Sequence, residues 1–421
     1  MKSNNKNPAL VFNCHYNGLS IIQELGRHGI QVFALDNTRS VGTVSRYAKF
    51  WRCPDPLSDE EGFINFLLNR GRNFKVPPVL FPTNDHWATA IAKHKIRLEQ
   101  YYILCVADWS VVKLLVCKDE FYTWALERGY PVPIVYTIDE LMKAESDVFP
   151  VIAKPKYRRI SGQEQEGDKD DIVKRLDEKR MVVLESDNAL HDFLSANKDL
   201  LPHIIFQEYV PGMADQMYTV GIYADRNHDV LGVFTGRKVR GYPPDIGDCV
   251  VGQVEKLPLE LVTLVKKMVK DLHYHGIAEF EFKKDPRNGE FKLIEINPRS
   301  WSWIGITPAC DVSLLWIAYA DLTGMEKGTY KESAIDQGDV KYIKILEDFL
   351  NCMYSYKKSG FPAYQMSLIQ WWKSLRAKKK IYAEFCWDDP GVWLYSLFRF
   401  TKAIAAAFFR RRHGSSSWSG K

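Results

Sequence analysis

The stretch AEFEFKKDPRNGEFKLIEINPR, residues 278–299, places several carboxylates inside what reads as two β-strands. Apolar and polar side chains alternate in both halves, which is typical of strands with one buried face, so the stretch predicts a hairpin. Glu281 and Glu295 are each flanked by large apolar residues, and an acid embedded in such a run is rarely left without a partner. We expect a partner for these two acids, whereas Glu279 and Glu290 are expected to face solvent.

A divalent cation is one partner that would suit this hairpin. Mg²⁺ takes oxygen ligands from one or two carboxylates and completes its shell with phosphate oxygens and water. Asn297, two residues after Glu295, projects from the same face and adds a neutral oxygen. Glu281 joins that face only if the loop has an odd length, such as the five residues Asp285–Gly289, which Pro286 favours over a two-residue turn. The residues therefore predict a metal site and an odd-length loop.

The composition bounds the class of protein. A chain of 421 residues with 46% hydrophobic and 26% charged residues is typical of a soluble globular protein with about two to three domains. Its eight cysteines form no CxxC pair, so neither a zinc site nor a redox motif is indicated, and such scattered thiols favour a cytoplasmic location. The polar N-terminus does not resemble a signal peptide, and no apolar run approaches the ~18–20 residues of a membrane span.

Before the hairpin, the chain alternates between β-rich and helical segments. A strand, a helix and a second strand at 8–13, 18–29 and 30–36 indicate an open α/β unit with a parallel sheet, although a GxGxxG loop is missing. Asn84 or Asp85 is expected to cap a helix after the next strand. The remaining predicted elements are strands at 77–85, 101–108, 148–156 and 203–212, a continuous helix at 110–129, a hairpin at 218–239 and a helix at 259–276.

In this order, the segments resemble the ATP-grasp superfamily of carboxylate–amine ligases over roughly residues 8–325. The resemblance rests on the segments CKDEFYTWALERGYPVP, FPVIAKPK, FQEYVPG, GRK and the hairpin with its ending EINPR. It implies an α/β ATP-grasp fold, in which a Rossmann-like N-terminal domain precedes two α+β lobes around an ATP site. The expected domains are 1–112, the small lobe 113–205, the large lobe 206–328, and a mainly helical, basic C-terminal extension 329–421.

The resemblance also implies roles for single residues in nucleotide binding. Lys118 and Lys154 resemble the two lysines that contact ATP phosphates. Gln207, Glu208 and Val210 resemble the hinge between the lobes, whose main chain meets the adenine edge. Asp215 stands near the position of an acid that holds the ribose. For the two lysines the alternatives are an exposed lysine at a helix start and a strand lysine whose amine reaches solvent.

The remaining implied roles concern the metal and the transferred phosphoryl group. The residues that resemble Mg²⁺ ligands are Glu281, Glu295 and Asn297. Lys238, with Arg240 nearby, resembles the residue that reaches the terminal phosphates, and Arg299 resembles the arginine beside the transferred phosphoryl group. A solvated basic turn is the alternative for Lys238 and Arg240. The implied cofactors are ATP and Mg²⁺, with Mn²⁺ as a substitute.

One loop departs from the family pattern. The segment after Lys154 is usually rich in glycine and closes over phosphates with its main-chain N–H groups. Here it reads KYRRISGQEQEGDKDD, with few glycines and many charges. Either Arg158, Arg159 and Ser161-Gly162 take over this contact, or closure waits for substrate.

The resemblance implies that a carboxylate is activated by ATP as an acyl phosphate and joined to an amine, with release of ADP and phosphate. One alternative is a carboxylase or another acyl-phosphate-forming enzyme on the same fold. The alternative of another class is an inactive scaffold that docks through its basic tail. The expected partners are small carboxylates and amines, with a homodimer left open. Nucleic acid is not expected, since the body is acidic and shows no recognised motif.

The charge of the chain is concentrated at its C-terminal end. Residues 360–421 carry eleven Lys and Arg against three acids, a net +8, whereas the whole chain is +5 and residues 1–359 are therefore −3. Residues 370–412 combine these bases with tryptophan and phenylalanine, a combination that suits an anionic membrane surface. The alternative is that the segment packs on the body and its charges are solvated. The expected location is cytoplasmic, with contact at the inner membrane face left open.

Overall fold

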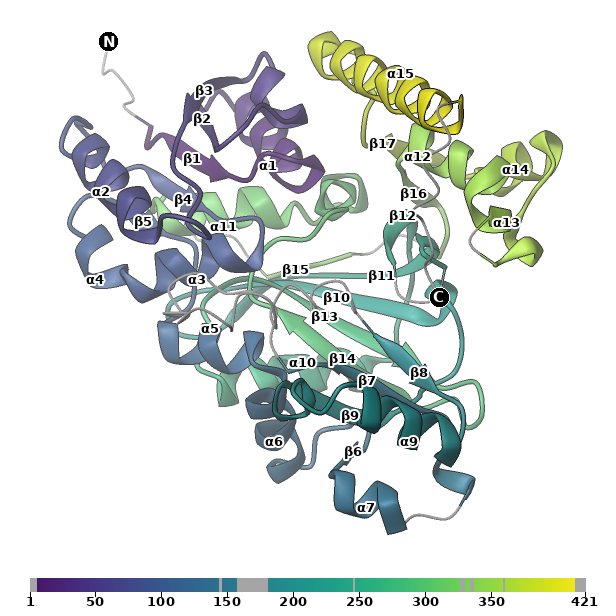
Figure 1. Ribbon diagram of the computed structural model, residues 1–421. Helices are drawn as coiled ribbons and strands as arrows, with labels where there is room; N and C mark the ends of the chain where they lie inside the picture. The colour runs from purple at the N-terminus through teal and green to yellow at the C-terminus, as the bar shows by residue number, and fades with distance from the viewer. Residues whose placement is uncertain are drawn as a thin grey trace.

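The computed structural model describes residues 6–143, 146–156, 181–244, 247–325, 330–333, 337–358 and 360–412. Within these ranges the strands form three sheets. Figure 1 shows the N-terminal sheet at the upper left, the large sheet in the centre and the small sheet below it. The predicted α/β fold class is confirmed by this arrangement.

The N-terminal sheet is parallel, as the sequence predicts, with the strand order β3-β2-β1-β4-β5 in the described residues. Successive residues of β1 point to opposite faces, so one set packs with α1 and the other with α2 and α3. The elements are β1 (Ala9–Phe12), α1 (Tyr16–Arg27), β2 (Val32–Asp36), a 3₁₀ turn (Val41–Val44), β3 (Ala48–Arg52), α2 (Glu60–Gly71), β4 (Val79–Phe81), α3 (Asp85–Lys93), α4 (Lys95–Leu98) and β5 (Ile103–Leu104).

Residues 110–129 do not form the single helix that their periodicity predicts. Two helices, α5 (Trp109–Val116) and α6 (Lys118–Glu127), meet at Cys117, whose backbone is extended with φ −94 and ψ 102. The N–H of Lys118 donates instead to the carbonyl of Lys156, at 2.7 Å. This tertiary hydrogen bond replaces a bond within a helix and ties the start of α6 to the segment that carries Lys154.

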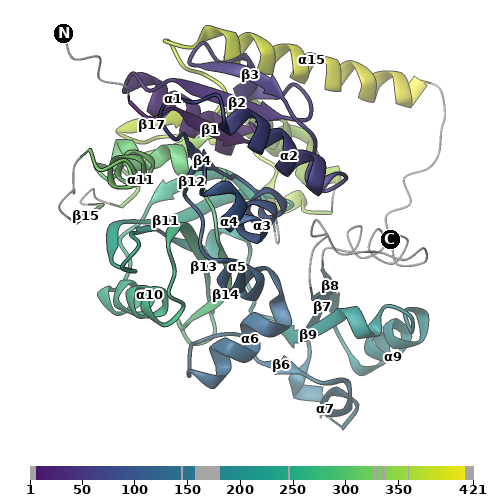
Figure 2. The same cartoon turned by 90° about the vertical axis from the view of Figure 1, so that its left-hand side faces the viewer.

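The small sheet is antiparallel, in the order β6-β9-β7-β8 among the described strands. Lys154 lies on β7, between β8 and β9. Figure 2 shows α7 and α9 on the outer side of this sheet. The elements are β6 (Val135–Tyr136), α7 (Ile138–Lys143), a 3₁₀ turn (Ser146–Val148), β7 (Val151–Pro155), β8 (Val182–Leu184), α9 (Asp187–Ala196), a 3₁₀ turn (Leu201–His203) and β9 (Ile204–Glu208).

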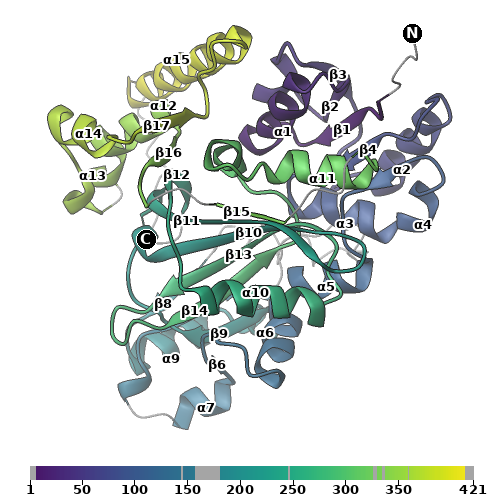
Figure 3. The ribbon, with the colours of Figure 1, turned by 180° about the vertical axis from the view of Figure 1, so that it is seen from behind.

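The large sheet carries the acidic hairpin. Its order in the described chain is β14-β13-β10-β11-β12-β16-β17, and β15 pairs with β11. Figure 3 shows α10 lying across this sheet. The elements are a 3₁₀ turn (Ala214–Gln216), β10 (Met217–Ala224), β11 (Val230–Tyr242), β12 (Asp248–Val254), α10 (Leu259–Asp271), β13 (Gly276–Lys284), β14 (Phe291–Asn297), a 3₁₀ helix (Ile304–Cys310), α11 (Leu314–Leu322) and β15 (Lys331–Glu332).

The C-terminal region contains strands as well as the predicted helices. β16 pairs antiparallel with β12, and β17 pairs parallel with β16, so this region continues the large sheet. Figure 2 shows that the far end of α15 reaches beyond the N-terminal sheet. The elements are β16 (Val340–Ile343), α12 (Ile345–Leu350), a π-helical turn (Asn351–Ser355), α13 (Tyr356–Lys358), a 3₁₀ turn (Pro362–Tyr364), α14 (Leu368–Ser374), β17 (Lys379–Tyr382) and α15 (Pro390–Arg412).

Candidate active site

The hairpin places Glu281 directly opposite Glu295, as a shared site requires, but its loop differs from the prediction. Six residues, 285–290, separate the paired residues Lys284 and Phe291, so the loop has an even length and the odd-length prediction is wrong. With that register alone, Glu281 would face residue 294. A shift of register between Glu281 and Phe282 inserts one extra residue in β14 and brings Glu281 opposite Glu295.

The extra residue is Ile294, and groups outside the hairpin hold the bulge. The hydroxyl of Tyr122, on α6, donates to the carbonyl oxygen of Ile294 at 2.5 Å. The N–H of the preceding residue, Leu293, donates to the carbonyl of Pro131 at 2.6 Å. The bulge is therefore stabilised by α6 and by the chain that follows it, rather than by the turn residues.

Glu279 belongs to the acidic face, against the expectation that it faces solvent. Its side chain is buried, and its two carboxylate oxygens accept hydrogen bonds from the hydroxyl of Thr219, at 3.0 Å, and from the amide of Asn297, at 3.1 Å. Burial, and then the neighbouring charge of Glu281, raise the pKa of Glu279 well above its ordinary value. The sequence held one signal for this: Glu279 lies two residues before Glu281 on the same strand, so both side chains project from the same face. Glu290 is exposed, as predicted.

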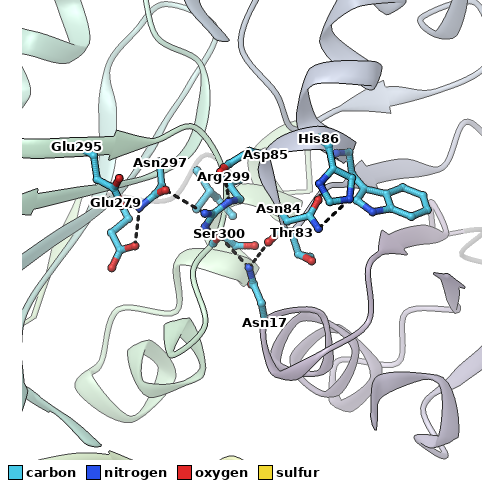
Figure 4. A network of polar contacts seen from close by, with 12 residues as sticks. Asn17, Thr83, Asn84, Asp85, His86, Glu279, Glu295, Asn297, Arg299 and Ser300 are labelled. Atoms are coloured by element: carbon cyan, nitrogen blue, oxygen red, sulfur yellow. Dashed lines mark hydrogen bonds and ion pairs between the residues drawn. The ribbon is translucent and has the colours of Figure 1, made fainter. Parts of the chain in front are cut away.

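The amide of Asn297 links the hairpin acids to Arg299. Its Nδ2 lies 3.1 Å from Glu279 Oε2 and 3.4 Å from Glu295 Oε1, and its Oδ1 accepts from Arg299 at 3.0 Å. The Arg299 guanidinium also donates from Nε to Asp85 Oδ1 at 2.7 Å. Figure 4 shows this chain of contacts running from the hairpin to the N-terminal domain.

Lys238 faces the same acids from β11. Its amine donates to Glu281 Oε2 at 2.9 Å, and both side chains are about nine-tenths buried, with 9% and 10% exposed. Burial opposes the charged form of Lys238, but Glu281 and Glu279 outweigh it and raise the pKa of the amine. A protonated lysine therefore balances the carboxylates here.

Lys154 is buried at the other side of the cavity. Its amine donates to Gln207 Oε1 at 2.6 Å and to the Tyr122 hydroxyl at 3.0 Å. Tyr122 thus contacts both Lys154 and the bulge in β14. Tyr122 was not predicted as a site residue, although it lies one helical turn after Lys118 in the segment that resembles the family.

These groups line a cavity of about 490 Å³ between the small and large sheets, within the range of small-molecule sites. Eight predicted site residues lie in its wall: Lys118, Lys154, Gln207, Glu208, Val210, Lys238, Glu281 and Glu295. Asn297 and Arg299 are not part of this wall: Asn297 contacts the wall residue Glu295, and Arg299 contacts Asn297.

The predicted hinge connects the two sheets. Gln207 and Glu208 end β9 of the small sheet, and the chain then passes through Tyr209 and Val210 into the large sheet. The Glu208 carboxylate is held by Arg287 at 2.8 Å and by the N–H of Ile134 at 3.2 Å. Its side chain is thereby directed to the hairpin loop, while the segment after it lines the cavity.

Besides Asn297 and Arg299, two further predicted residues, Arg240 and Asp215, lie outside the cavity wall. Arg240 is held by both carboxylate oxygens of Asp348, each at 2.7 Å, and the pair is buried in the C-terminal region. The register of β11 against β12 shifts between Lys238 and Arg240, so their side chains reach different surroundings. Asp215 is a neighbour of the wall residue Ala214, and its backbone carbonyl accepts from Arg237 at 3.2 Å. The loop residues Arg158, Arg159, Ser161 and Gly162 lie outside the described residues.

The donor set suits a hard cation that is shared with phosphate. No group of three or more His, Cys, Asp or Glu side chains in the described ranges has the arrangement of a complete metal site. Instead, Glu279 and Glu295 approach one amide N–H donor of Asn297, which stands where a positive charge is favoured. Mg²⁺ characteristically uses one or two carboxylates together with substrate phosphates. The residues present therefore fit this cation.

No family profile matches this chain. One curated protein is similar to part of it. A D-aspartate ligase of Enterococcus faecium is 27% identical over 232 residues, which are 52% of this chain and 53% of that protein. The chain thus matches about half the length of this relative.

Solved structures show the fold. An N5-carboxyaminoimidazole synthetase from Staphylococcus aureus, complexed with ADP, is similar with a TM-score of 0.60 and 16% identity over 85% of this chain and 87% of that chain. An L-amino acid ligase from Bacillus licheniformis is similar with a TM-score of 0.55 and 16% identity, over 76% of this chain and 74% of that chain. A third similar structure is the biotin carboxylase domain of a Hydrogenobacter thermophilus 2-oxoglutarate carboxylase, complexed with magnesium ADP and bicarbonate. Its TM-score is 0.58 and its identity 14%, over 80% of this chain and 74% of that chain. The chain therefore has the ATP-grasp fold.

Proposed function

We propose that this protein is an ATP-dependent ligase that activates a carboxylate as an acyl phosphate and joins it to an amine. The observation that carries the proposal is the convergence of Lys154, Lys238, Glu281 and Glu295 on one cavity between the two sheets. Similarity to a D-aspartate ligase and to an L-amino acid ligase supports an amino acid as one substrate.

ATP would lie in the cavity with its base at the hinge and its phosphates toward the hairpin. Lys118 and Lys154 approach from the small-sheet side, and Lys238 approaches from the large sheet. Glu281 and Glu295 in the wall, with Glu279 and Asn297 behind them, are the proposed residues around Mg²⁺, for which Mn²⁺ could substitute. When bound, the cation offsets charge on the phosphate oxygens during transfer.

The residues of the chain contribute positioning and electrostatics. A carboxylate oxygen of the substrate attacks the γ-phosphorus, the bond to the β,γ-bridging oxygen breaks, and ADP leaves. The amine then attacks the acyl carbon, phosphate departs with the former carboxylate oxygen, and the amine loses a proton. Lys238 and Arg299, both cationic, are placed to stabilise the negative charge that these steps move. Because these two side chains are already held in place before the reaction, no free energy has to be spent on orienting them during it.

An ADP-release assay with Mg²⁺-ATP and a matrix of carboxylates and amines, D-aspartate included, tests this function. We expect one carboxylate–amine pair to stimulate ADP release and mass spectrometry to find the amide. A carboxylase, the alternative supported by similarity to the biotin carboxylase domain, would respond to bicarbonate with one acceptor. ATP binding without stimulation by any combination would favour an inactive scaffold instead.

We further propose a cytoplasmic protein whose helix α15 contacts an anionic membrane surface. No helix within the described residues is long and apolar enough to cross a bilayer. On α15, Val392 is buried against the N-terminal domain, while Leu394 and Phe398 are 65% and 63% exposed. All three acids of the tail point inward or are paired: Glu384 and Asp389 are buried, and Asp388 binds Arg27. The outward charge of the tail is therefore basic, which opposes pairing of two such helices and suits anionic lipid.

Co-sedimentation with phosphatidylglycerol vesicles at low and high salt tests the membrane contact. We expect binding at low salt that is lost at high salt and in the double variant Leu394→Ser/Phe398→Ser. Leu259→Ser, which changes an exposed leucine on α10, serves as the control. Equal sedimentation of the wild type and the double variant would refute the contact. Light scattering at the same salt concentrations decides whether a homodimer forms.

A further inference from the structure

Arg299 lies between Asp85 of the N-terminal domain and the acids of the hairpin. Its guanidinium donates from Nε to Asp85 at 2.7 Å, from one terminal nitrogen to Asn297 Oδ1 at 3.0 Å and from the other to the carbonyl of Ser300 at 2.9 Å. Only 14% of the Arg299 side chain is exposed. Asp85 belongs to the N-terminal domain and Asn297 to the hairpin, so one guanidinium connects the two.

The start of helix α3, where Asp85 lies, is held against the residue that follows Arg299. The Thr83 hydroxyl lies 2.8 Å and 2.7 Å from two backbone carbonyls at the end of β1, and Asn84 caps α3 by accepting from the N–H of Trp87. The amide of Asn17 donates to the carbonyls of both Thr83, at 2.6 Å, and Ser300, at 2.8 Å. Figure 4 shows these contacts grouped around Arg299. Asp85 is therefore a fixed point for the guanidinium.

Removing Asp85 would leave the hairpin acids as the nearest anionic partners of Arg299. Asp85 is the carboxylate that the guanidinium contacts directly, at 2.7 Å, whereas Glu279 and Glu295 are reached through the amide of Asn297. A guanidinium that turned toward Glu279 and Glu295 would satisfy the carboxylates that a cation needs.

We propose that Asp85 is a positioning residue that holds Arg299 away from the hairpin carboxylates and so keeps them available for the divalent cation. This inference rests on the proposed function, because it requires a cation at the hairpin. It assigns the N-terminal domain an indirect part in metal binding, through Arg299 rather than through a ligand of its own.

The test is Mn²⁺ binding measured by electron paramagnetic resonance on the full chain, with a non-hydrolysable ATP analogue present. We expect Asp85→Ala to weaken Mn²⁺ binding about threefold to tenfold, a typical coupling between neighbours in one network. Asp85→Asn, which can still accept the hydrogen bond, should show a smaller loss. Asp108→Asn removes an exposed pair with Lys95 elsewhere in the domain and is the control. If Asp85→Ala lowers the melting temperature but leaves the affinity of the folded protein unchanged, the role is only structural and the proposal is overturned.

A double-mutant cycle with Arg299→Met separates positioning from direct ligation. If Asp85 acts through Arg299, Asp85→Ala in the Arg299→Met background should change Mn²⁺ affinity by less than about twofold. An equal loss in both backgrounds would overturn the proposal. Glu295→Gln, measured beside them, tests the proposed function itself. Unchanged Mn²⁺ affinity in Glu295→Gln would contradict the cation site, whereas a loss in Glu295→Gln with none in Asp85→Ala would contradict this inference alone.

Discussion

The Tyr122 hydroxyl accepts a hydrogen bond from the amine of Lys154 at 3.0 Å. The same hydroxyl donates to the bulge residue of β14 at 2.5 Å, so one side chain links a proposed phosphate-binding lysine to the acidic hairpin. Burial raises the pKa of Tyr122, which keeps the proton that this arrangement needs.

Tyr122→Phe removes the link and keeps the ring in the core. We expect ATP affinity to fall about threefold to tenfold, since a hydrogen bond to a charged group contributes roughly 1.5–3 kcal/mol and Gln207 still holds Lys154. Calorimetric titration with ATP measures the loss. Tyr130→Phe removes a hydroxyl contact with Asp271 outside the cavity wall and is the control. Equal affinities in both variants would show that the Tyr122 link does not support nucleotide binding.

Lys154→Ala should weaken ATP binding and slow phosphoryl transfer together, each by about tenfold to a hundredfold, because the lysine would contact the phosphates before and during transfer. Lys156→Ala, which changes a nearby lysine that lies 3.8 Å from Asp119, is the matched variant. Titration and single-turnover ADP formation check both effects. Wild-type values in Lys154→Ala would return this residue to a purely structural role.

Arg240→Ala should destabilise the fold without weakening nucleotide binding. The change leaves the buried Asp348 carboxylate without its cationic partner, while the Trp371 indole N–H still donates to it at 2.7 Å, and the loss of one partner of a buried ion pair typically costs about 3–5 kcal/mol. Denaturant unfolding measures the stability. The comparison variant is Lys238→Met, which changes a residue of the cavity wall and should impair ADP formation. Were Arg240→Ala to retain stability and lose ATP affinity, the placement of Arg240 outside the site would be refuted.

Glu384 should make stability depend on pH. Its carboxylate accepts from the N–H groups of Ile345 and Leu346, and burial raises its pKa to about 7. Because the folded pKa lies above the unfolded value, the folded state binds more protons, and stability is lost as pH rises from about 5 to about 7. The loss is at most ~3 kcal/mol by linkage. The free energy of unfolding of Glu384→Gln should lack this component. Parallel pH profiles of both proteins would contradict the assignment.

The hairpin shows how far the sequence predicts the site. Alternation predicted two strands with acids on one face, since that pattern depends only on residues within the strands. The extra residue in β14 depends on Tyr122 and Pro131, which are far away in sequence, and no local signal predicts it. Arg240 likewise lies outside the cavity wall, because a register shift in β11 breaks the two-residue spacing from Lys238.

Other differences arise where a tertiary contact outweighs local preference. The helix predicted at 110–129 is interrupted because the N–H of Lys118 pairs with Lys156. The strands β16 and β17 are only four residues each, too short and too rich in lysine to stand out as strands. Asn84 or Asp85 was predicted as a helix cap; Asn84 takes that role, and Asp85 binds Arg299. A contact across 214 residues has no local signature.

The Mg²⁺ dependence of ADP release by the wild type and Glu295→Gln, in the same substrate mixture, tests the central claim most directly. If the hairpin holds the cation between ATP phosphates, Glu295→Gln should lose most ADP formation at limiting Mg²⁺, while its circular dichroism and melting temperature stay close to those of the wild type. Wild-type turnover by Glu295→Gln at limiting Mg²⁺ would contradict the account.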